Sequence, residues 1–438
     1  MMTLKLPFDM SKFIEFESKL TKGSFRFLLS RVIALLLSAL YLRFSLGIFG
    51  PSQIGSLLVF VSVFNLISMF DLGRSGFMLS IPDSYRSGSI NSEKFRCLIR
   101  THLTSMMRIS FFTAAIGLIV LLSGLISIED LLNASIQTKA LMFCSFYLGG
   151  VSTFLFKISP LLVKKERYQT LIVLQQFIPL YSTFLFSSFS PSSPVLFLIY
   201  ASVLIFIQSF NTFIVIRFVE FRKRGSLAIL NHPYLEYDNR RFGFLQVLNL
   251  FVSQVDVILI NAFLSTNDVA FYATFTKIFQ IPYLVYSNVL SIYTNSFATL
   301  VATMDKQKIL KLLLSIYTSA SIVVVPSFFF LLFADNMLAV FISNGFFQLN
   351  YTQKIIGLSL IVIAFLDYPL SLLRSSVVPS RNYFLIVIIA SLVNFSVSTI
   401  LLIEWNNPIA IIIPNLFTMA FINLPANLIL LRSLVGRK

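Results

Sequence analysis

The chain has 438 residues, of which 57% are hydrophobic and 15% aromatic, while only 12% are charged. Soluble domains carry about 25% charged residues, so this composition excludes a soluble protein and predicts a polytopic membrane protein. The formal net charge of +16 does not indicate nucleic-acid binding. The charges lie in short segments between apolar runs, where we expect them to face anionic membrane lipid.

Hydropathy divides the chain into apolar runs separated by short polar segments. A membrane span needs about 20 apolar residues. By that measure we expect about twelve spans, at residues 27–48, 54–81, 105–127, 140–163, 170–190, 194–216, 243–264, 269–302, 312–333, 355–373, 384–403 and 408–431. The first residues mix charged and apolar side chains, so we expect no cleaved signal peptide there. The predicted fold class is all-α, with about twelve transmembrane helices.

Lys and Arg residues are distributed unevenly among the segments that join these spans. Alternate segments, beginning with residues 1–26, contain 26 of the 34 Lys and Arg residues, whereas the other segments contain only Lys139 and Lys354. Positive residues mark cytoplasmic loops. Both termini are therefore expected in the cytoplasm, and Lys139 and Lys354 on the outer side.

The longest basic segment lies after the sixth span and divides the chain into two halves with similar hydropathy and turn positions, as in transporters built from repeats. The predicted organisation is a cytoplasmic N-terminal segment (1–26), a first six-helix lobe (27–216), a cytoplasmic linker (217–242), a second six-helix lobe (243–431) and a cytoplasmic tail (432–438).

Residues 41–79 predict a hairpin of two hydrophobic helices joined at Gly50-Pro51. Its ionisable residues, together with one just before it, are Arg31, Arg43, Asp71 and Arg74. An ionisable side chain inside lipid needs a partner or a watery cavity. Arg31 and Asp71 have equal depth and are expected to pair, although Asp71 could instead neutralise Arg74. Arg43 either faces an internal cavity or extends to the outer membrane surface.

A second hairpin, at residues 243–302, carries polar residues at helical spacing. One face of its first helix holds Gln246, Asn249, Ser253 and Asp256, and its second helix holds Lys277 and Gln280. A polar face inside a membrane is expected to look inward. Asp256 and Lys277 are predicted at matching depth, which allows a structural ion pair, a polar cavity lining, or both.

Asp367, in the tenth predicted span, has no visible partner in its own hairpin. A buried acid of this kind is a candidate for proton or sodium coupling, although a partner elsewhere in the fold is an equal alternative. No motif for nucleophilic catalysis is present, and the two cysteines and two histidines lack metal-site spacing. We expect no catalytic residue, no metal site and no cofactor.

The first hairpin resembles the N-terminal signature of the O-antigen and polysaccharide flippases. The matching residues are Arg43, Gly50, Pro51, Gly55, Asp71, Leu72 and Gly73. The second hairpin is similar to the seventh and eighth helices of that family, with Asp256, Tyr272 and Lys277 in the corresponding places, although Ser265-Thr266-Asn267 replaces the usual glycine of the turn. The resemblance implies a member of the multidrug/oligosaccharidyl-lipid/polysaccharide (MOP) exporter superfamily.

This resemblance implies a flippase, not an enzyme. Such a protein moves an undecaprenyl-diphosphate-linked oligosaccharide, an O-antigen (lipopolysaccharide) or capsular repeat unit, from the inner to the outer leaflet of the bacterial inner membrane. Alternating access coupled to H⁺ or Na⁺ is expected. The implied partners are the lipid-linked oligosaccharide, membrane lipid and a glycan polymerase.

The predicted substrate cavity is lined by Arg31, Arg43, Arg74, Gln246, Asn249, Asp256, Lys277 and Gln280. The predicted ion-coupling candidates are Asp71, Asp256 and Asp367. Two alternatives remain, a membrane glycan polymerase or ligase and a drug/cation antiporter of the same superfamily. The outer segments are short, which disfavours the enzyme, and the positive charges in the spans disfavour cationic drugs.

Overall fold

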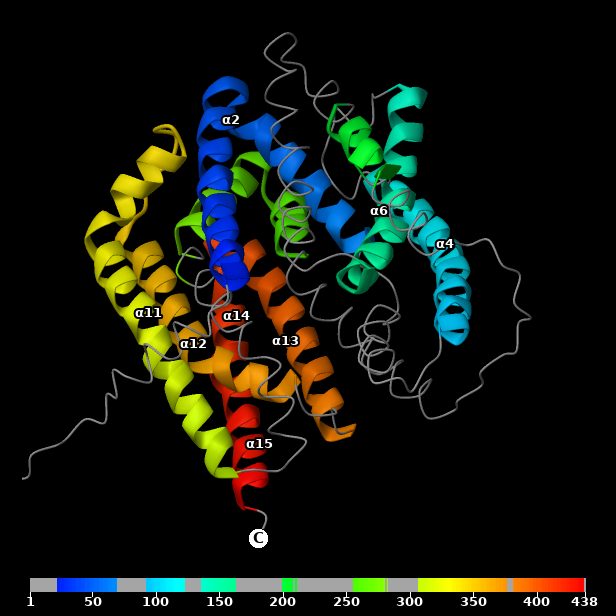
Figure 1. Cartoon of the computed structure of the whole chain (residues 1–438). Coiled ribbons are helices and arrows are strands. Elements are labelled where there is room, and N and C mark those ends of the chain that lie inside the picture. Colours follow the sequence, from blue (N-terminus) through cyan, green and yellow to red (C-terminus); the bar gives the residue numbers. More distant parts are fainter. Residues whose placement is uncertain are drawn as a thin grey trace, which may run out of the picture.

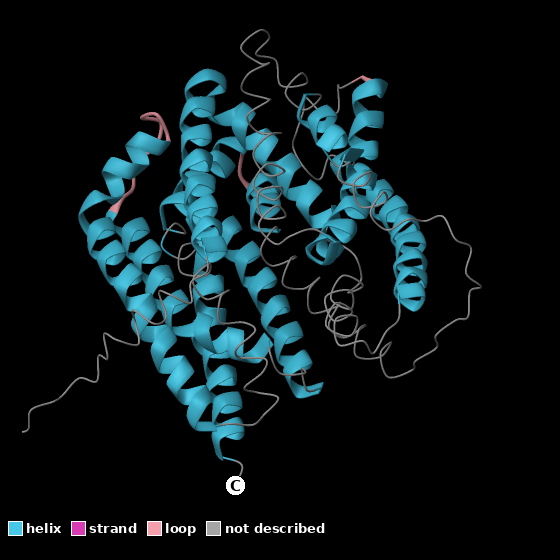
Figure 2. Cartoon of the chain, in the orientation of Figure 1, coloured by secondary structure: helices cyan, strands magenta, loops and turns pink. Residues whose placement is uncertain are grey.

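A computed structural model of the chain describes residues 22–68, 92–122, 135–162, 199–207, 209–210, 255–279, 282, 306–375 and 381–436. Nearly all of these residues are helical, and the described ranges contain no strand (Figure 2). The predicted all-α class is confirmed for this part of the chain.

The long helices are α2 (Lys22–Ser68), α4 (Ser92–Leu122), α6 (Ile136–Leu162), α11 (Lys306–Ile342), α12 (Tyr351–Ser375) and α13 (Arg381–Trp405). The last predicted span consists of a 3₁₀ turn η1 (Pro408–Ile411), α14 (Ile412–Phe417), a π-helical stretch η2 (Thr418–Asn423) and α15 (Leu424–Gly436). Helical residues also cover 199–207, 255–263 and 266–279.

Six stretches of the described helices are long and apolar enough to cross a membrane. They are Leu36–Ile67, Leu103–Val120, Ile309–Ile342, Tyr351–Ser371, Ile388–Trp405 and Pro408–Arg432. The other predicted spans fall wholly or partly outside the described residues, as does the linker at 217–242. The total of twelve, the two-lobe division and the side on which the termini lie therefore stay predictions.

Helix α2 contains the predicted first hairpin. As a straight helix its 47 residues would measure about 70 Å, more than twice the thickness of a bilayer's hydrocarbon core. The helix is broken at Gly50, whose φ of 77° and ψ of 167° lie outside the helical region and suit glycine. Figure 1 shows the chain rising through the first part of α2 and descending through the second. The two helices therefore meet directly at Gly50, without a loop.

Helices α11 and α12 form a further hairpin, with its turn at residues 343–350. The predicted ninth span, 312–333, lies within α11, which continues without interruption to Ile342. Helix α12 begins with a reciprocal cap, in which the Gln353 backbone N–H donates to Asn350 Oδ1 and the Asn350 N–H donates to Gln353 Oε1, both at 2.9 Å. This cap defines where the turn ends.

In Figure 1, α4 and α6 lie on one side of α2 and α11 lies on the other, while α13 to α15 lie below it. Aromatic side chains fill the contact of α2 with α6. Phe60 stacks on Phe146 with ring centroids 5.5 Å apart and meets Tyr200 edge-on at 5.9 Å. Phe60 and Phe146 are fully buried, whereas Phe112 on α4 and Phe333 on α11 are exposed, as lipid-facing side chains are.

Two glycines allow close helix contacts of different kinds, which gives a matched test of packing. A β-carbon at Gly55 would lie 1.8 Å from the backbone oxygen of Thr266, while one at Gly117 would lie 1.8 Å from the terminal carbon of Ile67. A side-chain end can move aside and a backbone cannot. We expect Gly55→Ala to destabilise the protein by about 1–3 kcal/mol and Gly117→Ala clearly less. Thermal denaturation in detergent measures the stability of both variants. An equal loss of stability in the two would contradict the backbone contact at Gly55.

Candidate functional site

Asp256 is buried at the meeting point of three helical segments. It lies on helix 255–263, with 7% of its surface exposed. The Tyr272 hydroxyl donates to Asp256 Oδ2 at 2.9 Å, and the Asn415 side-chain amide donates to the same oxygen at 3.1 Å. Tyr272 comes from helix 266–279 and Asn415 from α14, so two helices satisfy the carboxyl group of a third.

The polar contacts extend from Asn415 to a fourth helix. The Asn394 amide on α13 donates to Asn415 Oδ1 at 2.7 Å, and the Ser398 hydroxyl donates to Asn394 Oδ1 at 3.4 Å. Asn394 and Ser398 are buried. A buried polar group without a partner is costly in lipid, so this chain of hydrogen bonds holds Asn415 in one orientation toward Asp256.

A tight turn sets the position of Tyr272. Only Leu264 and Ser265 separate the two helices. Ser265 caps the second helix: its hydroxyl donates to Asp268 Oδ2 at 2.5 Å and accepts from the Asp268 backbone N–H at 3.3 Å. Counted from this turn, Tyr272 has nearly the same depth as Asp256. The Ser-x-x-Asp cap was readable from the sequence and would have placed the turn correctly.

Asp256 and Lys277 do not form the ion pair that their predicted equal depth allowed. Neither residue pairs with the other among the described residues, since the carboxyl of Asp256 bonds to Tyr272 and Asn415. The prediction assumed a longer turn. Because helix 266–279 starts directly at Thr266, Lys277 lies five residues beyond Tyr272, or about 7 Å deeper along the helix.

Lys277 is partly buried on helix 266–279. In the part of the chain that the structure describes, its ammonium group makes no hydrogen bond and no ion pair. A lysine that keeps its charge at this depth needs an anion or water. The expected pair is therefore not formed, and the described residues supply no other partner for this ammonium group.

Asp367 has a partner on another helix, the alternative that the sequence left open. The Asn427 amide on α15 donates to Asp367 Oδ1 at 2.8 Å, and both residues are buried. The neighbouring Tyr317 hydroxyl on α11 donates to the Leu366 carbonyl at 2.7 Å. Asp367 therefore belongs to a second buried polar contact, between α12 and α15.

The two environments predicted for Arg43, an internal cavity and the outer membrane surface, stay predictions, but its partner within the protein is defined. Its guanidinium group donates to the main-chain carbonyl of Phe341, in the last turn of α11. The same group lies 4.1 Å from the centroid of the Phe341 ring. In this structure Arg43 therefore binds the end of a helix.

The remaining predicted site residues lie outside the described part: Asp71, Arg74, Gln246, Asn249, Gln280 and the side chain of Arg31. They stay predictions. The sequence reasoning missed Asn394, Asn415 and Asn427, because it weighed only charged residues in the last spans. An amide inside an apolar span is itself a signal of an internal partner. No three His, Cys, Asp or Glu side chains of the described residues gather as a metal site.

Comparison with known proteins identifies the fold. No family model and no curated protein matches the sequence. Among solved structures, an inward-facing multidrug resistance MATE family transporter of the MOP superfamily has a TM-score of 0.68 at 13% identity, with 94% of this chain and 99% of that chain covered. The chain shares the fold of this MATE family structure.

Two further structures support the same assignment. The lipid II flippase MurJ in an inward closed conformation has a TM-score of 0.63 at 15% identity, covering 93% of this chain and 87% of that chain. An outward-facing MATE family transporter has a TM-score of 0.61 at 12% identity, covering 95% and 97%. All three neighbours share one fold with this chain. With the six apolar helices, they indicate a multi-pass membrane protein.

The hydrogen bond to Asp256 can be tested through stability. Tyr272→Phe removes only the hydroxyl, and a buried acceptor that loses a donor costs about 1–3 kcal/mol. We expect a lower thermal denaturation temperature in detergent. Tyr351→Phe is the matched control, because Tyr351 is 77% exposed, and we expect no change. Equal denaturation temperatures for the two variants would contradict a stabilising hydrogen bond from Tyr272 to Asp256.

Proposed function

We propose that the protein is a flippase that moves a polyprenyl-diphosphate-linked oligosaccharide across the bacterial inner membrane. The cargo is an O-antigen or capsular repeat unit, which passes from the inner to the outer leaflet by alternating access of two six-helix lobes. The observation that carries the proposal is Lys277, a lysine without a counter-ion among the described residues, in a MOP-type transporter fold.

The chemistry of the cargo fits this charge. A diphosphate carries several anionic oxygens, and a lysine ammonium binds phosphate strongly as a point charge. The prenyl chain can stay in lipid, because only the head group needs a polar path. The predicted residues Arg31, Arg74, Gln246, Asn249 and Gln280 would add charge and amide donors along that path. The fold likeness to a lipid II flippase supports a lipid-linked cargo.

Asp256 is the coupling residue that we favour. It is a buried carboxyl whose Oδ2 accepts from a hydroxyl and an amide, and no Lys or Arg of the described residues pairs with it. Binding of H⁺ or Na⁺ there would neutralise a charge that is costly to keep in lipid. Asp367, with Asn427 as its partner, is the second candidate, and Asp71 stays a third.

A drug/cation antiporter is the competing function, because MATE family transporters share the fold. Positive charge inside the spans disfavours it, since Lys277 would repel a cationic drug. Efflux of ethidium from cells that express the protein separates the two functions. Export that raises drug resistance, without any change in surface glycan, would favour the antiporter.

The role of Lys277 can be tested by a leaflet-resolved assay of the lipid-linked oligosaccharide. A charge-assisted hydrogen bond to phosphate contributes about 1.5–3 kcal/mol. We therefore expect Lys277→Ala to lower translocation about tenfold or more at unchanged membrane levels, and Lys277→Arg to retain most of it. Lys311→Ala, which removes an exposed charge from α11, is the control. Translocation by Lys277→Ala at the wild-type rate would contradict the proposal.

Coupling can be tested in proteoliposomes with an imposed proton or sodium gradient. Asp256→Asn keeps the size and the acceptor oxygen but removes the ionisable group. We expect it to translocate equally with and without the gradient that stimulates the wild type. Asp367→Asn is the parallel variant for the second candidate. If Asp256→Asn still responds and Asp367→Asn does not, Asp367 is the coupling residue and the assignment of Asp256 is wrong.

A further inference from the structure

The middle of α2 contacts two segments of the second half of the chain. The contacts join Arg43, Gly47, Ser52 and Gly55 on α2 to Thr266, Phe341 and Asn344. We call these seven residues the α2 junction. They come from the break in α2, the turn before helix 266–279 and the turn after α11. All three positions are predicted to lie at the outer end of the protein.

We propose that the α2 junction is the gate that closes this outer end, and that Arg43 is its latch. This inference rests on the proposed transport function, because a gate needs a cargo. It deepens that function by giving Arg43 a role different from the predicted cavity lining. Arg43 holds the closed state and does not bind the cargo.

The latch combines two favourable interactions. The last carbonyls of a helix carry partial negative charge and lack partners within the helix. Arg43 donates to one of them, the carbonyl of Phe341, which lies 298 positions further along the sequence. Its guanidinium also lies 4.1 Å from the Phe341 ring centroid, a cation–π distance. One charge thus joins α2 to α11.

Close packing completes the closure on either side of the break at Gly50. A β-carbon at Gly47 would lie 2.5 Å from the Asn344 side-chain nitrogen, and one at Gly55 would lie 1.8 Å from the Thr266 backbone oxygen. The hydroxyls of Ser52 and Thr266 share a hydrogen bond of 3.1 Å. Little room is left between the segments, so cargo cannot pass until they separate.

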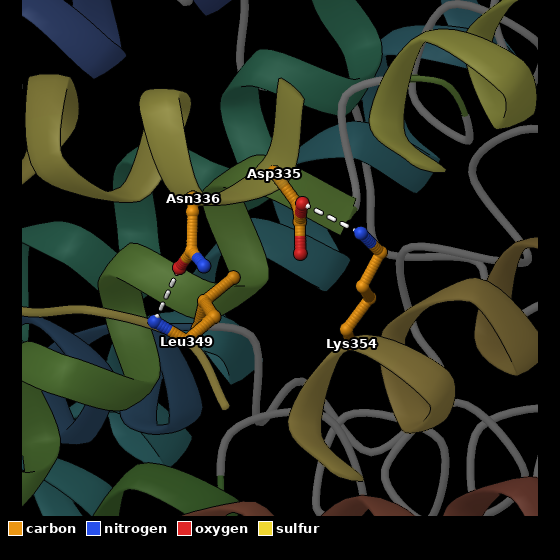
Figure 3. A network of polar contacts seen from close by, with 4 residues as sticks. All are labelled: Asp335, Asn336, Leu349 and Lys354. Carbon is orange, nitrogen blue, oxygen red and sulfur yellow. Dashed lines mark hydrogen bonds and ion pairs between the residues drawn. The ribbon is translucent and has the colours of Figure 1, made fainter. Parts of the chain in front are cut away.

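The turn after α11 is held rigidly, so that Phe341 and Asn344 are presented to α2. Lys354 forms an ion pair of 3.1 Å with Asp335 Oδ1, and the Leu349 backbone N–H donates to Asn336 Oδ1 at 2.8 Å (Figure 3). Asp335 is 2% exposed. These contacts fasten the far side of the turn to α11. The α11–α12 turn can therefore move against α2 as one unit.

Two polar atoms of α2 that neighbour junction residues in the sequence are left unsatisfied. The Ser45 hydroxyl and Gln53 Oε1 are buried and have no hydrogen-bond partner among the described residues. A buried polar group without a partner raises the free energy of the packed state. Arg43 holds together a surface that is otherwise incompletely satisfied, as expected of a contact that must be broken in every transport cycle.

A disulfide across the junction tests the gate directly. In full-length protein carrying Cys97→Ser and Cys144→Ser, the pair Ser52→Cys and Thr266→Cys replaces two hydroxyls that are 3.1 Å apart. We expect the oxidised double variant to lose translocation and to regain it on reduction. Each single variant is the control and should stay active under oxidation. Failure of the disulfide to form, or full activity of the oxidised protein, would overturn the proposal.

Cysteine labelling tests the latch without any cargo. Ser45→Cys places a thiol at a fully buried position two residues after Arg43. With a membrane-impermeant maleimide applied to right-side-out vesicles, we expect Arg43→Ala to raise the labelling rate about tenfold. Arg43→Lys should give a smaller rise. Arg108→Ala, at an exposed position on α4, should give none.

The outcomes separate this inference from the flippase assignment. Faster labelling in Arg43→Ala supports the gate even if no lipid-linked oligosaccharide is moved, because the assay needs no cargo. Unchanged labelling together with reduced binding of the lipid-linked oligosaccharide makes Arg43 a cargo ligand and overturns the latch. Labelling that increases only in inside-out vesicles places the junction on the cytoplasmic side and overturns the outer gate.

Discussion

The structure depends on one constraint of the lipid environment: a buried polar group can find its partner only within the protein. Asp256 shows how strongly this constraint acts. Its Oδ2 receives donors from Tyr272 and from Asn415, and Asn394 in turn orients Asn415. Helices 255–263, 266–279, α13 and α14 thus meet at one carboxyl group, and their packing supplies its hydrogen-bond partners.

The two basic residues meet the same constraint in different ways. Arg43 places its charge on the Phe341 carbonyl and ring, so its cost in lipid is offset inside the protein. Lys277 has no such partner among the described residues. Under the proposed transport function, a protein must offer charge to its cargo and neutralise it elsewhere, so Lys277 would mark the cargo path and Arg43 the contact that moves.

Local sequence patterns predicted the helices well, but they could not predict contacts between residues far apart in the sequence. Hydropathy predicted the all-helical class, and Gly50 predicted the break in α2. The turn at Leu264–Ser265 was predicted too long, so Lys277 was placed at the depth of Asp256 in error. Asn415 lies 159 residues from Asp256, and no spacing within a hairpin can reveal that contact. The same holds for Arg43, whose partner lies on a helix near the opposite end of the chain.

One short hairpin connects the candidate coupling site to the α2 junction. Asp256 and Tyr272 bond across the two helices of residues 255–279, and Thr266, which contacts Ser52 and Gly55, begins the second of them. A helix transmits displacement along its length because its backbone hydrogen bonds keep it stiff. Under the proposed coupling, an ion that changed the contacts of Asp256 would displace the second helix, and Thr266 would move against a surface that leaves no space at Gly55. The same rigid hairpin would then link ion binding at Asp256 to opening of the α2 junction.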